Sequence, residues 1–273
     1  MSDGWQGMIA YLGATLVRLE RQFHVMAKAL DAPQQQGQFG WFRYKDHTDT
    51  LLCFLKGVKM ISTLNAALVL LQRGYVQEVN VLCRVADDCA SDIIYMIKPE
   101  ADRALVEKQV RFMKDFFQEE FADPTNVLGS RQKREGGTRQ SVFAAFGRAT
   151  DEQEILNRSD AQNMLTVTHG AMSGYVHGAY PHIMDLYGGL PPHFHISGMS
   201  GTPREREGFN QLVTHLYRAI MASAFISMKL GLTNVEKELR EQLAEFETTL
   251  DCRPTDDPET LVRKEKEKKP PSR

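Results

Sequence analysis

Apolar residues recur at steps of three and four along most of the chain, a spacing that places them on one face of an α-helix. The first such stretch covers residues 5–31, where Leu12, Leu16 and Leu19 belong to a single apolar stripe. Comparable stretches cover residues 44–73, 75–97, 100–121, 140–148, 160–188, 203–230 and 233–250. We therefore predict an all-α protein, a multi-helix bundle of about seven helices with negligible β structure.

Glycine and proline divide these stretches. Gly74 is placed to end one helix, so the junction at residues 73–75 predicts an antiparallel helical hairpin. Pro99 ends the next helix, and Pro203 lies near the first turn of a later one. Residues 189–201 are too rich in proline and glycine for a helix, and residues 193–196 (HFHI) form the only short stretch that favours an extended strand. The loops at 32–40 and 122–137 are expected to carry no regular structure.

The helices differ in how much of their surface is apolar. Residues 44–73 are apolar on more than one side, which predicts a helix at the centre of the bundle. The helix at 100–121 has a narrower stripe, which we expect to be buried and which contains Val106, Val110, Met113, Phe116 and Phe117. We predict one domain over residues 1–250, with an N-terminal amphipathic helix and loop at 1–40 and the main bundle at 41–250. Residues 251–273 have no apolar periodicity and are expected to form a disordered charged tail.

Composition narrows the class of protein. The net charge of −2 gives no overall attraction to nucleic acid or to an anionic membrane. The four cysteines, Cys53, Cys83, Cys89 and Cys252, show no zinc-ligand spacing and suggest reduced, mostly buried thiols. The first residues lack the features of a secretory signal, and no unbroken apolar run approaches the ~20 residues of a membrane span. We expect a soluble, cytoplasmic protein that does not enter a membrane.

Five of the eight histidines lie between residues 169 and 195, and imidazole is well suited to proton transfer near neutral pH. His169, Ser173 and His177 are four residues apart, so we expect them along one face of a helix that also contains Gly170, Gly174 and Gly178. Helical glycines each cost about 1 kcal/mol relative to alanine, which indicates close approach of another helix, a ligand or a partner. The alternative is tight packing around histidines that hydrogen-bond within the core.

Arg84 and Asp88 are also spaced for an ion pair within one helix. Their neighbours are apolar enough for Arg84 to be only partly exposed, and its planar guanidinium suits a phosphate or a carboxylate. A structural ion pair that joins two helices is the alternative interpretation.

Two weaker candidates remain. His193 and His195 point to the same side of an extended segment, and together with His182 they form a weak alternative metal site. Arg131, Lys133, Arg134 and Arg139 make a short basic loop that either contacts a nucleic-acid backbone or is simply solvated. Phosphate-loop, dinucleotide-binding and nucleophile-elbow motifs are absent from the sequence, so we expect no cofactor and assign no metal site.

The helix with Arg84-Val-Ala-Asp-Asp88 and the later helix with Ser173-Gly-Tyr-Val-His177-Gly together resemble a widespread, poorly characterised bacterial family. That family is distantly similar to the HEPN superfamily of helical bundles, over residues 45–230 of this chain. The resemblance implies metal-free RNA cleavage at a homodimer interface. In this interpretation His177 transfers the proton of a ribose 2′-hydroxyl, Arg84 stabilises the phosphate, and Asp88 and Ser173 complete the site.

The chain departs from the HEPN pattern in one respect. An arginine should precede the catalytic histidine by four to six residues, but the nearest one upstream of His177 is Arg158. The only formal match to that spacing is Arg18 with His24, in the first helix. We therefore keep two hypotheses open: a homodimeric protein that handles RNA or a nucleotide phosphate, and a non-enzymatic helical interaction protein in which the same residues form a structural network.

Overall fold

The computed structural model describes residues 3–36, 41–97, 103–123, 125–126, 128–133, 139–152 and 157–250. Within these ranges the chain forms nine α-helices and two small two-stranded sheets. The prediction of an all-α multi-helix bundle is confirmed. The predicted tail at 251–273, with Cys252, lies outside the described residues.

The centre of the bundle is the hairpin of α2 (Asp49–Gln72) and α3 (Val76–Ile97). Helix α2 begins at Thr48, whose hydroxyl accepts a hydrogen bond from the backbone N–H of Leu51. The chain reverses at Gly74, which has a φ of 75° that glycine adopts without strain. The predicted helical hairpin at residues 73–75 is therefore confirmed.

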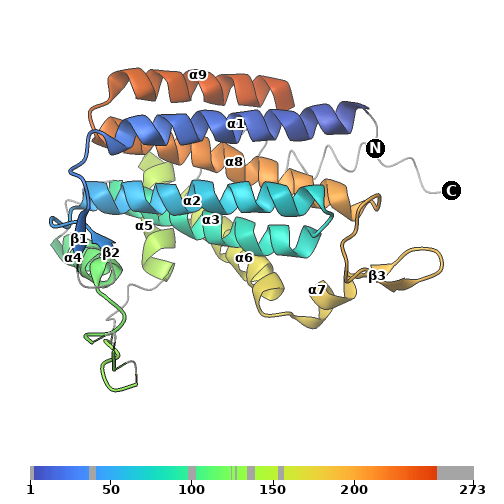
Figure 1. Cartoon of the computed structure of the whole chain (residues 1–273), viewed down its shortest axis with the longest axis horizontal. Coiled ribbons are helices and arrows are strands. Elements are labelled where there is room, and N and C mark those ends of the chain that lie inside the picture. The colour runs from blue at the N-terminus through green and yellow to red at the C-terminus, as the bar shows by residue number, and fades with distance from the viewer. Residues whose placement is uncertain are drawn as a thin grey trace.

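Three further helices complete the main layer: α1 (Asp3–Ala27), α8 (Arg204–Lys229) and α9 (Thr233–Leu250). They run alongside α2, with α9 outermost (Figure 1). The apolar stripe predicted for the first helix is buried here: Leu12, Leu16 and Leu19 are fully enclosed. Phe246 of α9 is enclosed as well and stacks on Tyr11. Burial of these stripes drives the association of the helices.

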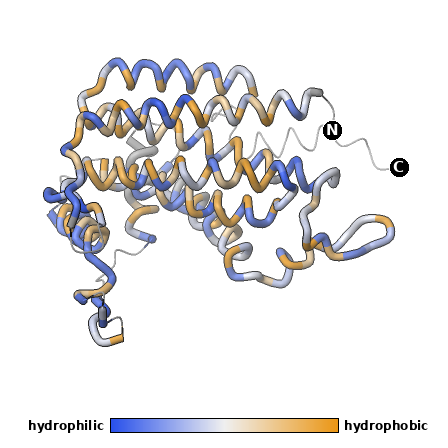
Figure 2. The backbone as a smooth tube through the Cα atoms, in the orientation of Figure 1, coloured by the Kyte–Doolittle hydropathy of each residue, from blue (hydrophilic) through white to orange (hydrophobic). Residues whose placement is uncertain are grey.

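Helix α2 is more apolar along its length than its neighbours (Figure 2). It is the one described helix that is long and apolar enough to cross a membrane by length and composition. However, α1, α3 and α8 pack against it and bury much of its surface. Such burial is typical of the central helix of a soluble bundle, as predicted for residues 44–73.

The second layer contains α4 (Arg103–Phe117), α5 (Arg139–Glu152), α6 (Arg158–Val176) and the short α7 (Tyr180–Met184). Helices α5 and α6 pack on each other and on α3. In α4, Met113, Phe116 and Phe117 pack against the core, but Val106 and Val110 are exposed. The buried stripe predicted for this helix was therefore wrong at Val106 and Val110; among the side chains described in this half, the buried one is Gln109, which donates a hydrogen bond to the carbonyl of Tyr95 at 2.7 Å.

The long helix predicted over residues 160–188 is also wrong at its C-terminal end. Helix α6 stops at Val176, and Gly178 follows with a φ of 61°, a left-handed conformation that commonly ends helices. At the other end, α6 begins two residues earlier than predicted, and the side chain of Asn157 caps it by accepting a hydrogen bond from the backbone N–H of Asp160.

The two sheets are both antiparallel hairpins. β1 (Gln34–Gln36) pairs with β2 (Trp41–Arg43), and β3 (Tyr187–Gly188) pairs with β4 (His193–Phe194). The predicted extended segment at HFHI is thus present at its first two residues. The expectation that it would be the only one was wrong, because the glutamine run in the predicted loop at 32–40 also forms a strand.

Candidate functional site

Helix α3 carries a polar stripe along its inward face. Its members are spaced at i, i+3, i+4, i+7 and i+8, the same pattern that marks a buried apolar face. They are Arg84, Asp87, Asp88, Ser91 and Asp92. All are buried except Asp88, whose side chain is 27% exposed. Only Arg84 and Asp88 were identified from the sequence, although the spacing of the five residues places them all on one face of the helix and could have identified the other three.

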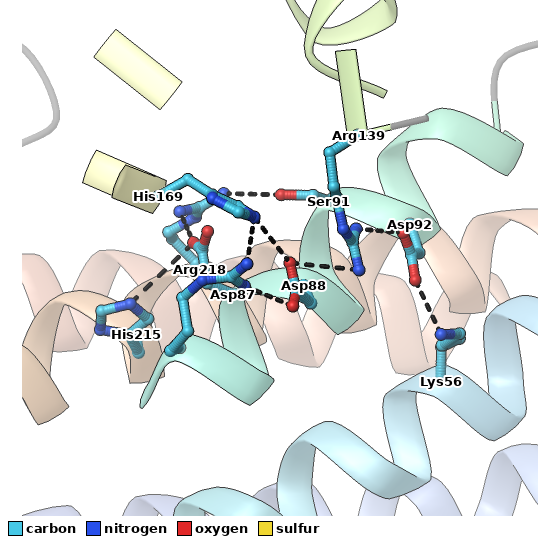
Figure 3. Close-up of polar contacts among 10 residues, drawn as sticks. Lys56, Asp87, Asp88, Ser91, Asp92, Arg139, His169, His215 and Arg218 are labelled. Carbon is cyan, nitrogen blue, oxygen red and sulfur yellow. Dashed lines mark hydrogen bonds and ion pairs between the residues drawn. The ribbon is translucent and has the colours of Figure 1, made fainter. Parts of the chain in front are cut away.

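One part of this stripe, at Arg84 and Asp88, is partly accessible to solvent. Together with Arg139 and His169 from other helices, these two residues form what we call the open site. Figure 3 labels Asp88, Arg139 and His169. The guanidinium of Arg84 contacts Asp88 within α3 and also the Nε2 atom of His169 on α6. Arg139, the first residue of α5, reaches Asp88 Oδ1 at 3.1 Å. The side chains of Asp88, Arg139 and His169 are between a fifth and two fifths exposed, while that of Arg84 is 9% exposed.

The imidazole of His169 is neutral at pH 7. Burial lowers its pKa, the nearby Arg84 and Arg139 lower it further, and Asp88 opposes them. Because a guanidinium has only donors, Nε2 of His169 accepts the hydrogen bond from Arg84 and the ring proton lies on Nδ1. The ring also packs edge-on against Phe143, with 5.3 Å between ring centroids.

The other part of the stripe lies deeper in the bundle, where the Asp87 side chain is 3% exposed and that of its partner Arg218 is 17% exposed. Asp87 pairs with Arg218 of α8, and Ser91 lies 3.5 Å from the same guanidinium. Burial lowers the pKa of Arg218 to about 10, which leaves it charged at neutral pH. We call Asp87, Ser91, Arg218 and His215 the sealed cluster.

His215 of the sealed cluster is almost completely enclosed. Its Nδ1 donates a hydrogen bond to the carbonyl of Gln211 at 2.7 Å, and its Nε2 lies 3.9 Å from Asp87 Oδ1. Burial lowers its pKa, so the ring is neutral.

Asp92 extends the network from the open site to α2. It is 1% exposed and binds Lys56 of α2 at 2.7 Å and Arg139 of α5 at 2.6 Å. Through these contacts, charged side chains from α2, α5 and α8 all meet on α3 (Figure 3).

The structure brings together Arg84 and Asp88 but sets Ser173 and His177 apart from them. His169 and His177 are eight residues apart, or about 12 Å along a helix axis. Ser173 is half-buried near the C-terminus of α6, and the exposed His177 is the residue that ends it. Among the described residues, neither side chain hydrogen-bonds to the open site. The histidine that contacts Arg84 is His169.

The remaining candidates lie elsewhere. His182 of α7 stacks on Tyr175 over Gly174, while His193 and His195 adjoin each other on the second hairpin. Over the residues that the structure describes, no group of three or more side chains is arranged to hold a metal ion. Arg18 pairs with Glu245 of α9 at 2.6 Å, and His24 is exposed on α1.

The predicted basic loop is divided between two places. Arg139 belongs to α5 and the open site, which corrects its placement in a loop. Arg131 and Lys133 line a surface cavity of about 480 Å³ with Glu120 and Gln132. Arg134 lies outside the described residues.

The three described cysteines are free and buried. Burial raises the pKa of Cys53 and Cys83 to about 12 and that of Cys89 to about 11, so none is a ready nucleophile.

Comparison of the chain with protein-family models, with curated proteins and with solved structures found no match in any of the three.

Proposed function

We propose that the open site binds a phosphate group of RNA or of a nucleotide and, in its catalytic form, cleaves RNA without a metal ion. The observation that carries the proposal is the contact between the Arg84 guanidinium and the neutral imidazole of His169 at a partly exposed position. A base and a phosphate-binding group are thereby adjacent.

The charge around α3 favours an anion. The open site, the sealed cluster, Asp92 and Lys56 form one charge network on α3. Among its described residues are four cationic side chains (Lys56, Arg84, Arg139 and Arg218) and three carboxylates (Asp87, Asp88 and Asp92). The excess positive charge is in a partly buried environment, where it interacts more strongly than in water. Arg139 is the more exposed guanidinium of the open site, with 35% of its side chain accessible, and it can present paired donors to phosphate oxygens. Arg84 is 9% exposed with its Nε and Nη1 atoms buried, and it contacts His169 through Nη2.

The corresponding chemistry is attack of a ribose 2′-oxygen on the adjacent phosphorus. A phosphate that binds Arg84 competes for the guanidinium and frees the lone pair on Nε2 of His169. That nitrogen then accepts the proton of the 2′-hydroxyl as the P–O bond to O2′ forms and the bond to the 5′-oxygen breaks. The departing 5′-oxygen takes a proton from water, so the products are a 2′,3′-cyclic phosphate and a 5′-hydroxyl. Arg84 and Arg139 stabilise the negative charge, and Asp88 orients both.

The test is cleavage of single-stranded RNA by untagged protein, with and without EDTA, alongside His169→Ala and His177→Ala. We expect cleavage that survives EDTA and falls about 10²–10⁴-fold in His169→Ala, the range for loss of a general base. His177→Ala should retain activity. If instead His177→Ala abolishes cleavage and His169→Ala does not, the base is His177, as the HEPN resemblance implies.

The second candidate function is a non-enzymatic interaction protein with a structural charge network. The nearly complete burial of Asp92 between Lys56 and Arg139 favours it, because such a residue holds helices together without meeting a ligand. This hypothesis predicts no RNA cleavage by any form of the protein. It also predicts that His169→Ala leaves the affinity for a labelled RNA oligonucleotide unchanged in fluorescence anisotropy.

A further inference from the structure

Residues 177–196 form an arm that extends away from the helical body (Figure 1). Its base is fixed: the side chain of Gln77 donates a hydrogen bond to the carbonyl of His182, and Arg204 pairs with Asp185 at 2.7 Å. Just beyond the arm, the backbone N–H of Met199 donates to the carbonyl of Gly74 at 2.7 Å. The arm is therefore held in position by α3, by α8 and by the turn between α2 and α3.

The arm exposes apolar side chains to an unusual degree. Leu190 at the hairpin tip is 99% exposed and Ile196 is 80% exposed. Other large side chains on it are also open to solvent: Tyr180, Ile183, Met184, Tyr187 and Phe194. The only formally charged side chain in residues 177–196 is Asp185, and it is already paired with Arg204. A surface of this kind has few charges to desolvate when another uncharged surface covers it.

Two histidines lie together on this hairpin. The rings of His193 and His195 have centroids 4.2 Å apart. Nδ1 of His193 lies 3.0 Å from the carbonyl oxygen of Pro191, which fixes the proton on Nδ1 and leaves Nε2 as the free electron-pair donor. This backbone hydrogen bond is the arrangement that commonly orients a metal-binding histidine.

Gly189 faces both rings across the hairpin. A Cβ atom at this position would lie 3.4 Å from His193 Cε1 and 3.4 Å from His195 Nε2, and the φ of Gly189 is 87°. The positive φ favours glycine in this turn, and a Cβ atom there would only make ordinary van der Waals contact with the two imidazoles. A zinc ion bound at ~2.0–2.1 Å to each of two nitrogens needs them roughly 3–4 Å apart, which rings at this separation can provide.

We propose that His193 and His195 bind a divalent transition metal ion such as Zn²⁺ and that a second copy of this chain completes the coordination. Two imidazoles supply half of a tetrahedral set, and a copy related by two-fold symmetry brings the same pair to the same ion. The uncharged, apolar surroundings of the two hairpins pack together in that arrangement. This site is separate from the open site and does not depend on the function proposed there.

The test is the mass of untagged, EDTA-treated and dialysed protein in sedimentation equilibrium as ZnCl₂ is added. We expect the mass to double from that of the 30.9 kDa chain, with one zinc bound per two chains. EDTA should reverse the change. His193→Ala and His195→Ala should each weaken zinc-dependent association at least tenfold, since each removes two of the four ligands in the dimer.

His177→Ala is the matched control, because His177 is an exposed histidine of the same arm outside the hairpin, and its variant should dimerise normally. Ile196→Ser should weaken the dimer while both histidines remain. A single-chain mass throughout a titration that passes through one zinc per two chains overturns the proposal, as does a dimer that persists in EDTA or in both histidine variants. RNA cleavage by the open site is measured separately, so either proposal can fail without the other.

Discussion

Asp92 is the residue whose loss should most disturb the charge network. Its carboxylate is buried and pairs with both Lys56 and Arg139. The change Asp92→Asn keeps the side-chain volume but removes the carboxylate that pairs with Lys56 and leaves Arg139 paired with Asp88 alone. Because both cations retain some contact with solvent, we expect the free energy of unfolding to fall by about 2–3 kcal/mol, below the ~3–5 kcal/mol found when a fully buried pair is broken.

Urea denaturation of Asp92→Asn beside Glu245→Gln measures this effect. Glu245 makes a single ion pair with Arg18, and its side chain is 50% exposed. The same carboxyl-to-amide change should there cost less than about 1 kcal/mol, as exposed pairs generally do. Equal losses in the two variants would show that burial of Asp92 contributes nothing to stability.

The two neutral histidines make stability depend on pH in a defined direction. Burial lowers the pKa of His169 and of His215 in the folded state, so the unfolded chain binds protons more readily below its ordinary histidine pKa of about 6.5. Stability is therefore fully present above that pKa and is lost as the pH falls below it. The slope is at most about 1.4 kcal/mol per pH unit for each histidine. Asp87, the carboxylate nearest to His215 Nε2, is already engaged by Arg218 and offers limited compensation.

Urea unfolding at several pH values between 5 and 7.5 tests this expectation. Carboxylates with lowered pKa values, such as Asp49 and Glu119, lose their contributions only at lower pH. His215→Gln should flatten the dependence, whereas His24→Gln on the exposed surface of α1 should leave it unchanged. An unaltered slope in His215→Gln would contradict the assignment.

Single residues of the open site differed in how well the sequence could predict them. The pairing of Arg84 with Asp88 follows from their spacing within one helix, and the structure contains it. The contact between Arg84 and His169 depends on the register of α6 against α3, which no spacing within either helix encodes. The helical face that carries His169, Ser173 and His177 was identified, but which of them reaches Arg84 could not be.

At the scale of elements, the two glycines Gly57 and Gly170 both lie inside helices but have opposite surroundings. A Cβ atom at Gly57 would lie 2.6 Å from the ring of Phe23 and 2.8 Å from Ile226, both in the core, whereas nothing lies within 4 Å at Gly170. Gly57→Ala should therefore destabilise the protein by about 1–3 kcal/mol through overpacking of α2 against α1 and α8. Gly170→Ala should stabilise it by about 0.5–1 kcal/mol through helix propensity.

Thermal or urea unfolding of the two variants decides this prediction. A gain in stability for Gly57→Ala would mean that Phe23 of α1 and Ile226 of α8 shift away from the new methyl group at little energetic cost. The contrast also bears on the glycine-rich helix noted in the sequence. Of its three glycines, only Gly174 has a close neighbour, His182, while Gly178 supplies the left-handed turn after the helix.

Helix ends show where local signals sufficed and where they did not. Gly74 ends its helix as predicted because a glycine follows a clear apolar pattern. The pair His177-Gly178 carried the same signal, but the apolar residues beyond it, such as Ile183 and Met184, continued the helical spacing. These residues are exposed in the arm, so their spacing does not reflect a buried face.

At the scale of the whole molecule, the charge network is a tertiary feature. It joins α2, α3, α5, α6 and α8 through residues whose partners are distant in sequence, such as Asp87 with Arg218. Apolar periodicity was enough to predict the helices and the central position of α2, because both depend on the burial of stripes. Which charged residues pair between helices depends on the rotation of each helix about its axis and on its alignment with its neighbours. Both are determined only when the complete core packs.

The same distribution of burial predicts a gradient of local stability. Helices α2, α3 and α8 contain most of the enclosed side chains, whereas α7 has none among its described residues. In hydrogen–deuterium exchange, peptides from α2, α3 and α8 should open only with free energies close to that of global unfolding, and peptides from α7 and the β3–β4 hairpin should exchange with little protection. Strong protection of the arm in the metal-free monomer would contradict this gradient. Zinc bound within one chain would order only the hairpin around His193 and His195, whereas a second copy also covers the exposed apolar residues of the arm. Zinc-dependent protection that extends to α7 and rises with protein concentration therefore reports the proposed dimer.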